Sequence, residues 1–310
     1  MIDLHLHTTA SDGRCTPREL VARAAAAGVL VMAVTDHDTT AALAEVDAAA
    51  RESGLEAVSG IEITAVEDGR DIHVLGYLFD PGNAALGALL QAARQARIAR
   101  VEAIGSRLAS LGAAVDLTAL LRQATLESGR SVGRPQVARA LVDAGHVADT
   151  QEAFDRWLAN GRPGCVGREG PTTEKVIEVI HRAGGIASLA HPGKLERFSF
   201  RSSASRRAQA FSKSAFPRFS VSTESKNALG LSGQIPALAR AGLDAIEAYH
   251  PDHNASLVGR YVDIARELDL LLTGGSDFHG DPAHGCSPGT VTLPAAEFAR
   301  LREARPHAVD

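Results

Sequence analysis

The feature that most constrains the fold is a repeated alternation of short apolar runs with longer helical patterns. Helix starts are marked clearly, as in Thr16-Pro17-Arg18-Glu19, where Thr, Pro and Glu occupy the positions preferred at a helix N-terminus. Strand-like apolar runs cover residues 2–6, 30–35, 56–63, 71–79, 186–190, 244–249 and 270–274. Seven strands punctuated by helices predict a parallel α/β sheet, open or closed.

Two stretches depart from this alternation. Residues 83–161 are purely helical in pattern, with a long segment at 84–111 and shorter ones at 135–144 and 150–159. We interpret them as a helical insertion subdomain positioned to cap a barrel mouth. Residues 195–233 are rich in Ser, Arg and Phe without clean periodicity, and are predicted to form a mobile loop. The barrel would then comprise residues 1–82 and 162–310.

Composition limits the classes of protein that fit. The 310 residues are 45% hydrophobic and 22% charged, which is enough to bury a large core without disulfides. A net charge of -5 argues against binding to long duplex nucleic acid. The three cysteines are odd in number and widely spaced, which indicates a reducing compartment. The chain has no apolar run of about 18 residues and no signal-peptide pattern, so we expect a cytoplasmic protein without a membrane span.

Histidines and carboxylates fall at the ends of the predicted strands. His5 and His7 lie two residues apart on the first strand, so both side chains point to the same face and can bind one cation. The carboxyl ends of barrel strands meet at one face, so ligands scattered through the chain would form one cluster. The other members are Asp12, Asp36, His37, Asp38, Glu62, His73, His191, Asp277 and His279.

Each of these elements also has a simpler explanation. An isolated His-x-His is more often incidental than metal-binding, and Asp36 or Asp38 is placed to cap a helix start. His191 precedes Pro192 and fits a turn. Glu62 and His73 lie in apolar strands, where a buried charge is costly unless it is paired or bound to metal. The joint pattern, with six of the twelve histidines at successive strand ends, favours a metal centre.

These segments resemble the signature segments of the polymerase and histidinol phosphatase (PHP) family. The resemblance covers nearly the whole chain except the Ser-rich stretch, and it implies a distorted (β/α)7 barrel with a helical insertion. Within the family, the chain is most similar to the stand-alone branch that acts on nucleoside 3',5'-bisphosphates and very short 5'-phosphorylated RNAs. The matching segments are Asp3-Leu4-His5-Leu6-His7, Thr35-Asp36-His37-Asp38, Gly60-Ile61-Glu62, Asp71-Ile72-His73, Ala190-His191-Pro192 and Ser276-Asp277-Phe278-His279.

The resemblance also implies two or three divalent metals and their ligands. Mixed imidazole and carboxylate ligands suit Mn, Fe or Zn, and the family favours Mn2+ over Zn2+ or Fe2+. By motif, the first metal would bind His5, His7, Glu62 and Asp277; the second Glu62, His73 and His191; and the third Asp12, His37 and His279.

The expected reaction is hydrolysis of a phosphate ester by metal-bound hydroxide, because coordination lowers the pKa of water from about 15.7 towards 7. The expected partner is a small phosphorylated nucleotide or a short RNA. Asp36, His191 and His250 are the candidate catalytic groups. His250 is a candidate proton donor or pocket residue, and a hydrogen-bonded turn histidine is the alternative.

Substrate-binding candidates lie on the helical insertion. Arg134, in Gly133-Arg134-Pro135, is the first choice for a second phosphate, because its guanidinium binds phosphate oxygens bidentately. The alternative is a solvated arginine at a helix start. Arg97 and Arg100 are further candidates. Gln136 stands where the branch commonly has His, which is a departure at a substrate contact.

Three rival functions fit parts of the same pattern. A histidinol-phosphate phosphatase would share the metals and the barrel, and differ only in the pocket. An amidohydrolase usually needs a metal-bridging lysine after a central strand, and the predicted strand ends carry none. A non-catalytic, metal-stabilised PHP module would predict missing ligands, whereas all nine positions are filled.

Overall fold

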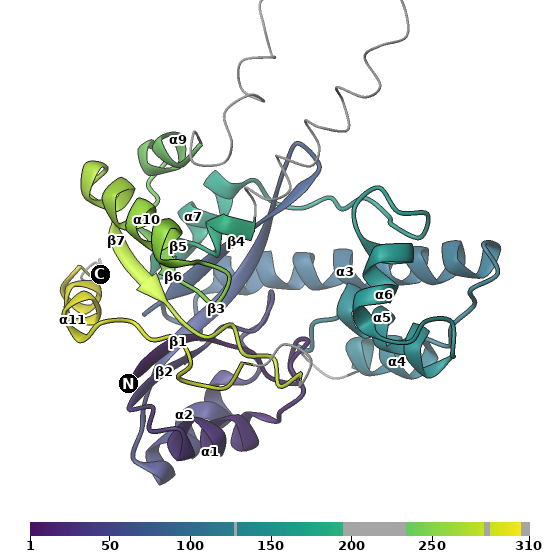
Figure 1. The fold of residues 1–310 in the computed structure, drawn as a ribbon, viewed down its shortest axis with the longest axis horizontal. Coiled ribbons are helices and arrows are strands. Elements are labelled where there is room, and N and C mark those ends of the chain that lie inside the picture. Colours follow the sequence, from purple (N-terminus) through teal and green to yellow (C-terminus); the bar gives the residue numbers. More distant parts are fainter. Residues whose placement is uncertain (127–128, 195–233, 282–285, 305–310) are drawn as a thin grey trace, which may run out of the picture.

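The computed structural model describes residues 1–126, 129–194, 234–281 and 286–304. Seven strands form one sheet in the sequential order β1 to β7, which curls into a nearly closed barrel (Figure 1). An isolated parallel bridge between Leu6 and Phe278 joins the two edges of the sheet. The predicted (β/α)7 barrel is therefore confirmed, while the loop predicted at 195–233 lies outside the described residues.

The prediction of an all-parallel sheet is wrong at the fourth strand. β4 pairs antiparallel with both β3 and β5, whereas the other pairs are parallel. Strands β3 and β4 are joined by the two-residue turn Asp68-Gly69, and both residues have positive φ (50° and 74°), as a tight hairpin requires. Two residues cannot carry the crossover that parallel strands need. The strands are β1 (Ile2–Leu6), β2 (Val31–Val34), β3 (Glu56–Glu67), β4 (Arg70–Tyr77), β5 (Ile186–Leu189), β6 (Ala245–Tyr249) and β7 (Leu271–Gly274).

Helices surround the sheet. The predicted helix start at Thr16 is confirmed, because its hydroxyl accepts from the Glu19 N–H while Glu19 bonds back to the Thr16 N–H. The next barrel helix begins at Leu43, because the Thr39 hydroxyl donates to the Gly129 carbonyl and accepts from the Ala41 N–H, which keeps the residues before Leu43 out of the helix. The barrel helices are α1 (Pro17–Ala26), α2 (Leu43–Ser53), α7 (Thr173–Arg182), α9 (Ile235–Arg240), α10 (Ala255–Glu267) and α11 (Ala295–Glu303).

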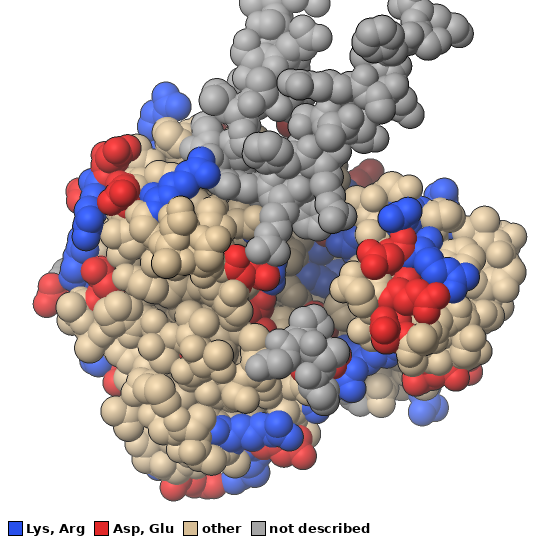
Figure 2. Space-filling model, in the orientation of Figure 1, with Lys and Arg blue, Asp and Glu red and all other residues tan. Residues whose placement is uncertain are grey.

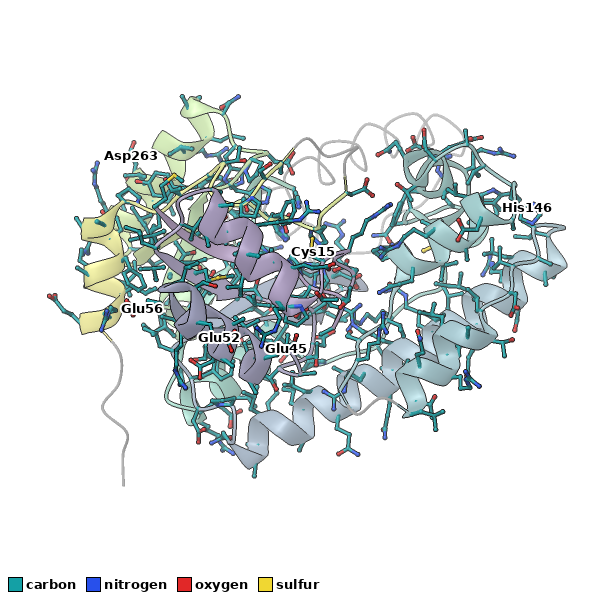
Figure 3. All side chains as sticks on the ribbon, turned by 90° about the horizontal axis from the view of Figure 1, so that it is seen from below. Cys15, Glu45, Glu52, Glu56, His146 and Asp263 are labelled. Carbon is teal, nitrogen blue, oxygen red and sulfur yellow. The ribbon has the colours of Figure 1, made fainter. Side chains whose placement is uncertain are left out.

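The helical insertion forms a lobe beside the barrel. Figures 1 and 3 show the long helix α3 running from the barrel to the lobe, with His146 near the lobe's outer edge. The single helix predicted at 150–159 is instead a short helix followed by a π-helical turn, a form often found at functional sites. The elements of the lobe are α3 (Ala84–Ser110), α4 (Thr118–Leu126), α5 (Arg134–Asp143), α6 (Thr150–Ala153) and η1 (Phe154–Leu158).

Helix α3 belongs to two apolar cores. Its first turns place Leu86 and Leu90 in the core between the sheet and α7 and α10. Its second half places Ile104 and Leu108 in a separate core with the other lobe helices. One continuous helix therefore fixes the lobe to the barrel. Within the described ranges, none of the helices combines the length and the apolar character that a membrane span requires.

Candidate metal centre

All nine predicted metal ligands meet at one end of the barrel. His5 and His7 come from β1 and its end, and Leu6 between them packs outward against α1 and α2. His73 reaches the same end because β4 is reversed, so its first residues lie beside the later residues of β3. Thr64 pairs with His73 in this register, and Glu62 lies two residues earlier on β3. The remaining ligands follow other strands: Asp12, His37, His191, Asp277 and His279.

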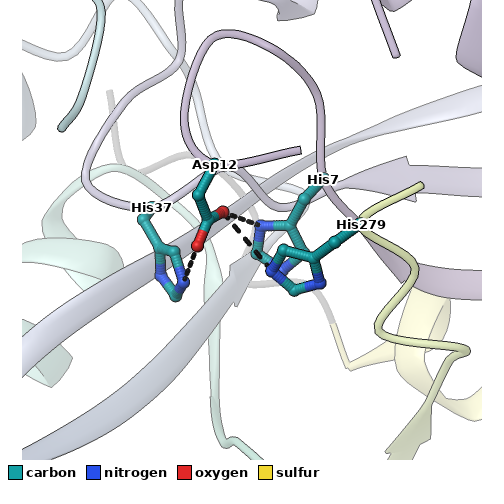
Figure 4. Close-up of side chains that lie close together, drawn as sticks. All are labelled: His7, Asp12, His37 and His279. Atoms are coloured by element: carbon teal, nitrogen blue, oxygen red, sulfur yellow. Dashed lines mark ion pairs between the residues drawn. The ribbon is translucent and has the colours of Figure 1, made fainter. Parts of the chain in front are cut away.

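Three groups of these side chains could each hold a cation, because their ligand atoms lie within 4.8 Å of one another. Figure 4 shows Asp12 between His37 on one side and His7 with His279 on the other. Its carboxylate oxygens lie 3.6 Å from His37 Nε2, 3.7 Å from His7 Nδ1 and 3.3 Å from His279 Nε2. The groups are His7, Asp12, His37 and His279; His5, His7 and Asp277; and His37, Glu62 and His73.

The grouping differs in part from the ligand sets implied by resemblance. His7 joins Asp12 and His279, and His37 joins Glu62 and His73. Glu62 lies at the centre, as a bridging ligand would. Its Oε1 lies 2.7 Å from His73 Nδ1 and 3.0 Å from His191 Nε2, and its Oε2 lies within 3.3 Å of three further imidazoles, those of His5, His7 and His37.

Burial and neighbouring charges act differently on the ligand side chains. Burial alone would lower the pKa values of His5 and His7, but the nearby carboxylates outweigh it, raising the pKa of His7 to about 10 and that of His5 well above its usual value, so a cation bound to them would displace a proton. Burial lowers the pKa of His37 to about 3 and that of His191 to about 4, so both imidazoles are neutral near pH 7. Burial alone would raise the pKa of Glu62, but the neighbouring imidazoles outweigh it and hold that pKa well below its usual value. Neutral imidazole and ionised carboxylate are the forms that bind metal ions.

The site also contains buried ring nitrogens that make no hydrogen bond, although the Glu62 carboxylate lies close to two of them, His7 Nε2 and His37 Nδ1. Within the described part of the chain, both ring nitrogens of His7, Nδ1 of His37 and Nδ1 of His191 are buried without a hydrogen bond. A buried polar atom left unpaired is costly, and a bound cation would satisfy such nitrogens. The donor set of imidazoles and carboxylates without thiolate also suits Mn, Fe or Zn. The residues present therefore fit divalent metals.

Glu247, on β6, is a buried residue that the sequence interpretation missed. Its carboxylate accepts the His5 Nδ1–H at 2.7 Å and the backbone N–H of His191 at 2.7 Å. Burial would raise the pKa of Glu247, but the charge and hydrogen bond of His5 bring it down to about 2. A signal was present, because an acidic residue inside the apolar strand Ala245-Ile246-Glu247-Ala248-Tyr249 is costly unless paired.

Two of the predicted catalytic residues have defined hydrogen bonds. Asp36 accepts from the backbone N–H and hydroxyl of Thr8 and from the Ser11 hydroxyl, so its oxygens hold the loop that carries Asp12. Nδ1 of His250 accepts the Asp252 N–H, so Nε2 carries the proton and lies 3.1 Å from Asp277 Oδ2. The same Asp277 oxygen also accepts from Lys194 at 2.6 Å, a cation that sequence reasoning missed.

An arginine-lined pocket opens beside His37 and His73. It has a volume of about 120 Å³, and the lobe contributes Arg97, Arg100 and Arg134 while the barrel contributes Arg168. Figure 2 shows Lys and Arg side chains in the hollow between barrel and lobe. No sequence pattern pointed to Arg168, which lies in an irregular segment.

The hydrogen bonds of the predicted substrate residues separate them into two kinds. Arg100 and Arg134 lie 3.4 Å and 3.3 Å from the same carboxylate, that of Asp71 on β4, at the pocket wall. Arg134 is thus held in the pocket rather than solvated at the start of α5. Arg97 is buried and donates to Asp38 at 2.5 Å. The Gln136 amide is used inside the protein, accepting from the Gly133 N–H and donating to the Ser11 carbonyl.

Known proteins share this sequence pattern. The model of the PHP domain family matches residues 3–158. A 5'-3' exoribonuclease of Haemophilus influenzae is 43% identical over 190 residues, covering 61% of this chain and 68% of the relative. A 3',5'-nucleoside bisphosphate phosphatase of Chromobacterium violaceum is 36% identical over 195 residues, covering 63% and 68%. A phosphoribosyl 1,2-cyclic phosphate 1,2-diphosphodiesterase of Eggerthella lenta is 30% identical over 286 residues, covering 90% and 94%.

Solved structures share the fold over almost the full chain. One from Bifidobacterium adolescentis, described as a metal-dependent phosphoesterase, superposes with a TM-score of 0.78 at 30% identity, covering 99% of this chain and 96% of that one. One from Chromobacterium violaceum, described as an amidohydrolase with bound sulfate, has a TM-score of 0.78 at 29% identity, covering 99% and 98%. The chain belongs to the PHP family and is an enzyme of its metal-dependent phosphoesterase class.

Proposed function

We propose that this enzyme removes the 3'-phosphate of nucleoside 3',5'-bisphosphates and cleaves short 5'-phosphorylated RNA in the 5'-3' direction. The main observation in support is that the nine metal-ligand side chains, here called the metal-ligand row, lie directly beside an arginine-lined pocket. The metal groups suit attack on one phosphate, and the arginines suit retention of a second. Relatives named as a bisphosphate phosphatase and an exoribonuclease supply the substrate class.

The nine side chains that gather at the barrel end are proposed to hold two or three divalent cations, most suitably Mn2+. When bound, such cations act as Lewis acids on phosphoryl oxygens and lower the pKa of water into the neutral range. The chain's own role is to keep the ligands in place. Glu247 accepts a hydrogen bond from His5 and so orients its ring, and Asp36 accepts one from Ser11 and so holds the loop that carries Asp12.

The pocket arginines are proposed to hold the 5'-phosphate, the one that is not cleaved. Arg100 donates to Asp71 and the Val166 carbonyl, and Arg134 to Asp71, the Leu158 carbonyl and Asn160. A guanidinium has five N–H donors, so each side chain keeps donors for an anion. Guanidinium groups bind phosphate oxygens bidentately, which fixes orientation as well as position. Arg97 and Gln136 are proposed to support the pocket from within, because their donors already meet protein acceptors.

The chemical step is the same for both substrates. Water adds to the phosphorus, the bond between phosphorus and O3' breaks, and O3' takes up a proton. A bisphosphate then yields a nucleoside 5'-monophosphate and inorganic phosphate, whereas RNA yields a nucleoside 5'-monophosphate and a chain with a new 5'-phosphate. His250, whose Nε2 carries a proton beside Asp277, is the proposed proton carrier for O3', whereas His191, beside Glu62, is proposed to act through the metal centre as a ligand.

The test is a substrate panel with the Mn2+-loaded protein. Phosphate release from adenosine 3',5'-bisphosphate is compared with release from histidinol phosphate, and with stepwise shortening of a 5'-phosphorylated RNA trinucleotide. A chelated sample and a His191→Ala variant are the controls. Activity on the nucleotides that both controls abolish supports the proposal. Activity on histidinol phosphate alone would overturn the substrate, and no activity on any member with metal bound would indicate a non-catalytic module.

A further inference from the structure

A second pocket opens on the other side of the metal-ligand row. It has a volume of about 210 Å³ and lies beside Asp277 and His279, whereas the arginine-lined pocket lies beside His37 and His73. The two pockets share three lining residues, Asp12, Pro135 and Phe154. The metal-ligand row therefore lies between two pockets. Pro135 and Phe154 of the lobe form a wall that both pockets share.

The second pocket carries its own cations. Arg14, Arg139 and Lys194 line it, from the loop after β1, from α5 and from the segment after β5. Arg139 is half-buried and donates to the Asp12 carbonyl at 2.9 Å, which holds its guanidinium at the pocket edge. Arg14 pairs with Asp281 at 2.9 Å.

The charge balance of this pocket depends on its carboxylates. Asp12, Asp277 and Asp281 face the three cations. Asp12 and Asp277 are proposed metal ligands, so bound cations would offset their charge. Among the described lining residues, three cations then remain against the single carboxylate of Asp281, a net charge of three minus one, or plus two. Such a pocket attracts a phosphodiester chain.

The chemistry of the two proposed substrates differs at one place. In both, the bond to O3' of the first nucleotide breaks, so that nucleotide and its 5'-phosphate occupy the same side. In RNA the attacked phosphate also carries the O5' of the next nucleotide, where the bisphosphate has a bare oxygen. If the first pocket holds the 5'-phosphate, the remaining chain must leave the metal centre on the opposite side.

We infer that the pocket lined by Arg14, Arg139 and Lys194 is a subsite for the RNA chain on the 3' side of the cleaved phosphate. This inference rests on the proposed function and deepens it. Nucleoside bisphosphates use the first pocket and the metal centre alone, whereas oligonucleotides use both pockets. Phe154, at the common wall, offers an aromatic face on which a base can stack.

The experiment compares Arg139→Gln and Arg14→Gln with the matched control Arg122→Gln, an exposed arginine of α4 that lines neither pocket. Binding is followed by fluorescence anisotropy, with a 3'-labelled, 5'-phosphorylated RNA trinucleotide whose first linkage is a phosphorothioate. KM values for the unlabelled trinucleotide and for adenosine 3',5'-bisphosphate are measured in parallel. Arg14 is exposed, so its variant does not depend on packing within the lobe.

We expect each pocket variant to weaken trinucleotide binding by about tenfold, the loss typical of one charged hydrogen bond. The slope of log affinity against log salt should fall by about 0.7 for each phosphate contact removed. The ratio of trinucleotide KM to bisphosphate KM should rise about tenfold, with Arg122→Gln leaving it unchanged. Equal losses for both substrates, or wild-type trinucleotide affinity in both variants, would overturn the subsite.

Failure of the proposed function gives a different result. The wild-type protein would then release no phosphate from the bisphosphate. The anisotropy measurement still decides the inference in that case, because it needs binding and not turnover. A trinucleotide that binds in an Arg139-dependent and Arg14-dependent way supports the subsite, and one that binds independently of both overturns it.

Discussion

Replacing Glu247 by Gln should weaken metal binding although Glu247 is not itself a proposed ligand. The carboxylate only accepts hydrogen bonds, so His5 donates its Nδ1–H, which leaves Nε2 as the ring atom that can bind a cation. That Nε2 lies 3.3 Å from both Glu62 and Asp277, inside the ligand row. In Glu247→Gln the amide oxygen can still accept the His191 N–H, and its NH2 group then faces His5.

The amide donor favours the wrong tautomer of His5. An NH2 group facing Nδ1 requires a lone pair there, which moves the imidazole proton to Nε2, the atom proposed to bind metal. Loss of a residue that orients a ligand typically costs 10–100-fold in metal affinity, equivalent to about 1.4–2.8 kcal/mol. The isosteric change creates no cavity, so the metal-free protein should keep its fold.

The affinity is measured by titrating chelator-treated protein with Mn2+ in a calorimeter, and by the rise in melting temperature that Mn2+ produces. A ligand that binds only the folded state stabilises it by RT ln(1 + [L]/Kd), so weaker binding reduces that rise. The matched control is Glu174→Gln, the same chemical change at an exposed residue of α7. Mn2+ affinity within about twofold of wild type in Glu247→Gln would refute the orienting role, since a residue that orients a metal ligand contributes about tenfold or more.

Contacts elsewhere in the molecule give three further expected outcomes. Asp38→Asn should destabilise the fold by about 3–5 kcal/mol in urea unfolding, because the buried guanidinium of Arg97 loses its carboxylate; an effect below about 1 kcal/mol would contradict the pairing. Phe154→Leu should weaken short-RNA binding by about 1–3 kcal/mol in anisotropy while keeping the apolar contact, and unchanged binding would exclude stacking. The hydrogen bond between His181 and Asp244 raises the pKa of His181, so its contribution to stability is present below the unfolded pKa of about 6.5 and is lost as pH rises through the folded pKa. Asp244→Asn should therefore destabilise more at pH 5.5 than at pH 9, by about 0.5 kcal/mol for this part-exposed pair, and an equal loss at both pH values would contradict it.

The gathering of the metal ligands was predictable because it depends on strand order and strand ends. His5 and His7 needed only the two-residue period of a strand, and His37 and His191 only the position after an apolar run. The direction of β4 was also readable, because Asp68-Gly69 leaves no room for a crossover, yet the rhythm of the other strands suggested a parallel sheet. The two-residue turn thus determines the direction of β4, although the alternation of strands and helices in the rest of the chain predicted a parallel strand.

Other parts of the site had little or no sequence signal. Glu247 could have been found by the same buried-charge reasoning that selected Glu62. Arg168 and Lys194 could not, since each reaches its carboxylate partner from an irregular or very short segment without periodicity. Gln136 shows the opposite case, because its place in the motif indicated a substrate contact while its amide is used by backbone groups. Which partner each of these side chains contacts depends on the tertiary structure, and residue type alone does not determine it.

The reversed strand has a consequence for how this enzyme could be altered. Barrel pockets are usually walled by loops, but here one wall is a regular hairpin that extends past the ligand row and carries Asp71 near its tip. Glu62 and His73 lie further down the same ladder, held by its hydrogen bonds. Residues added or removed at Asp68-Gly69 would therefore change the height of the wall without moving a ligand. The hairpin tip is a place where substrate size could be tuned, by evolution or by design, independently of the metal chemistry.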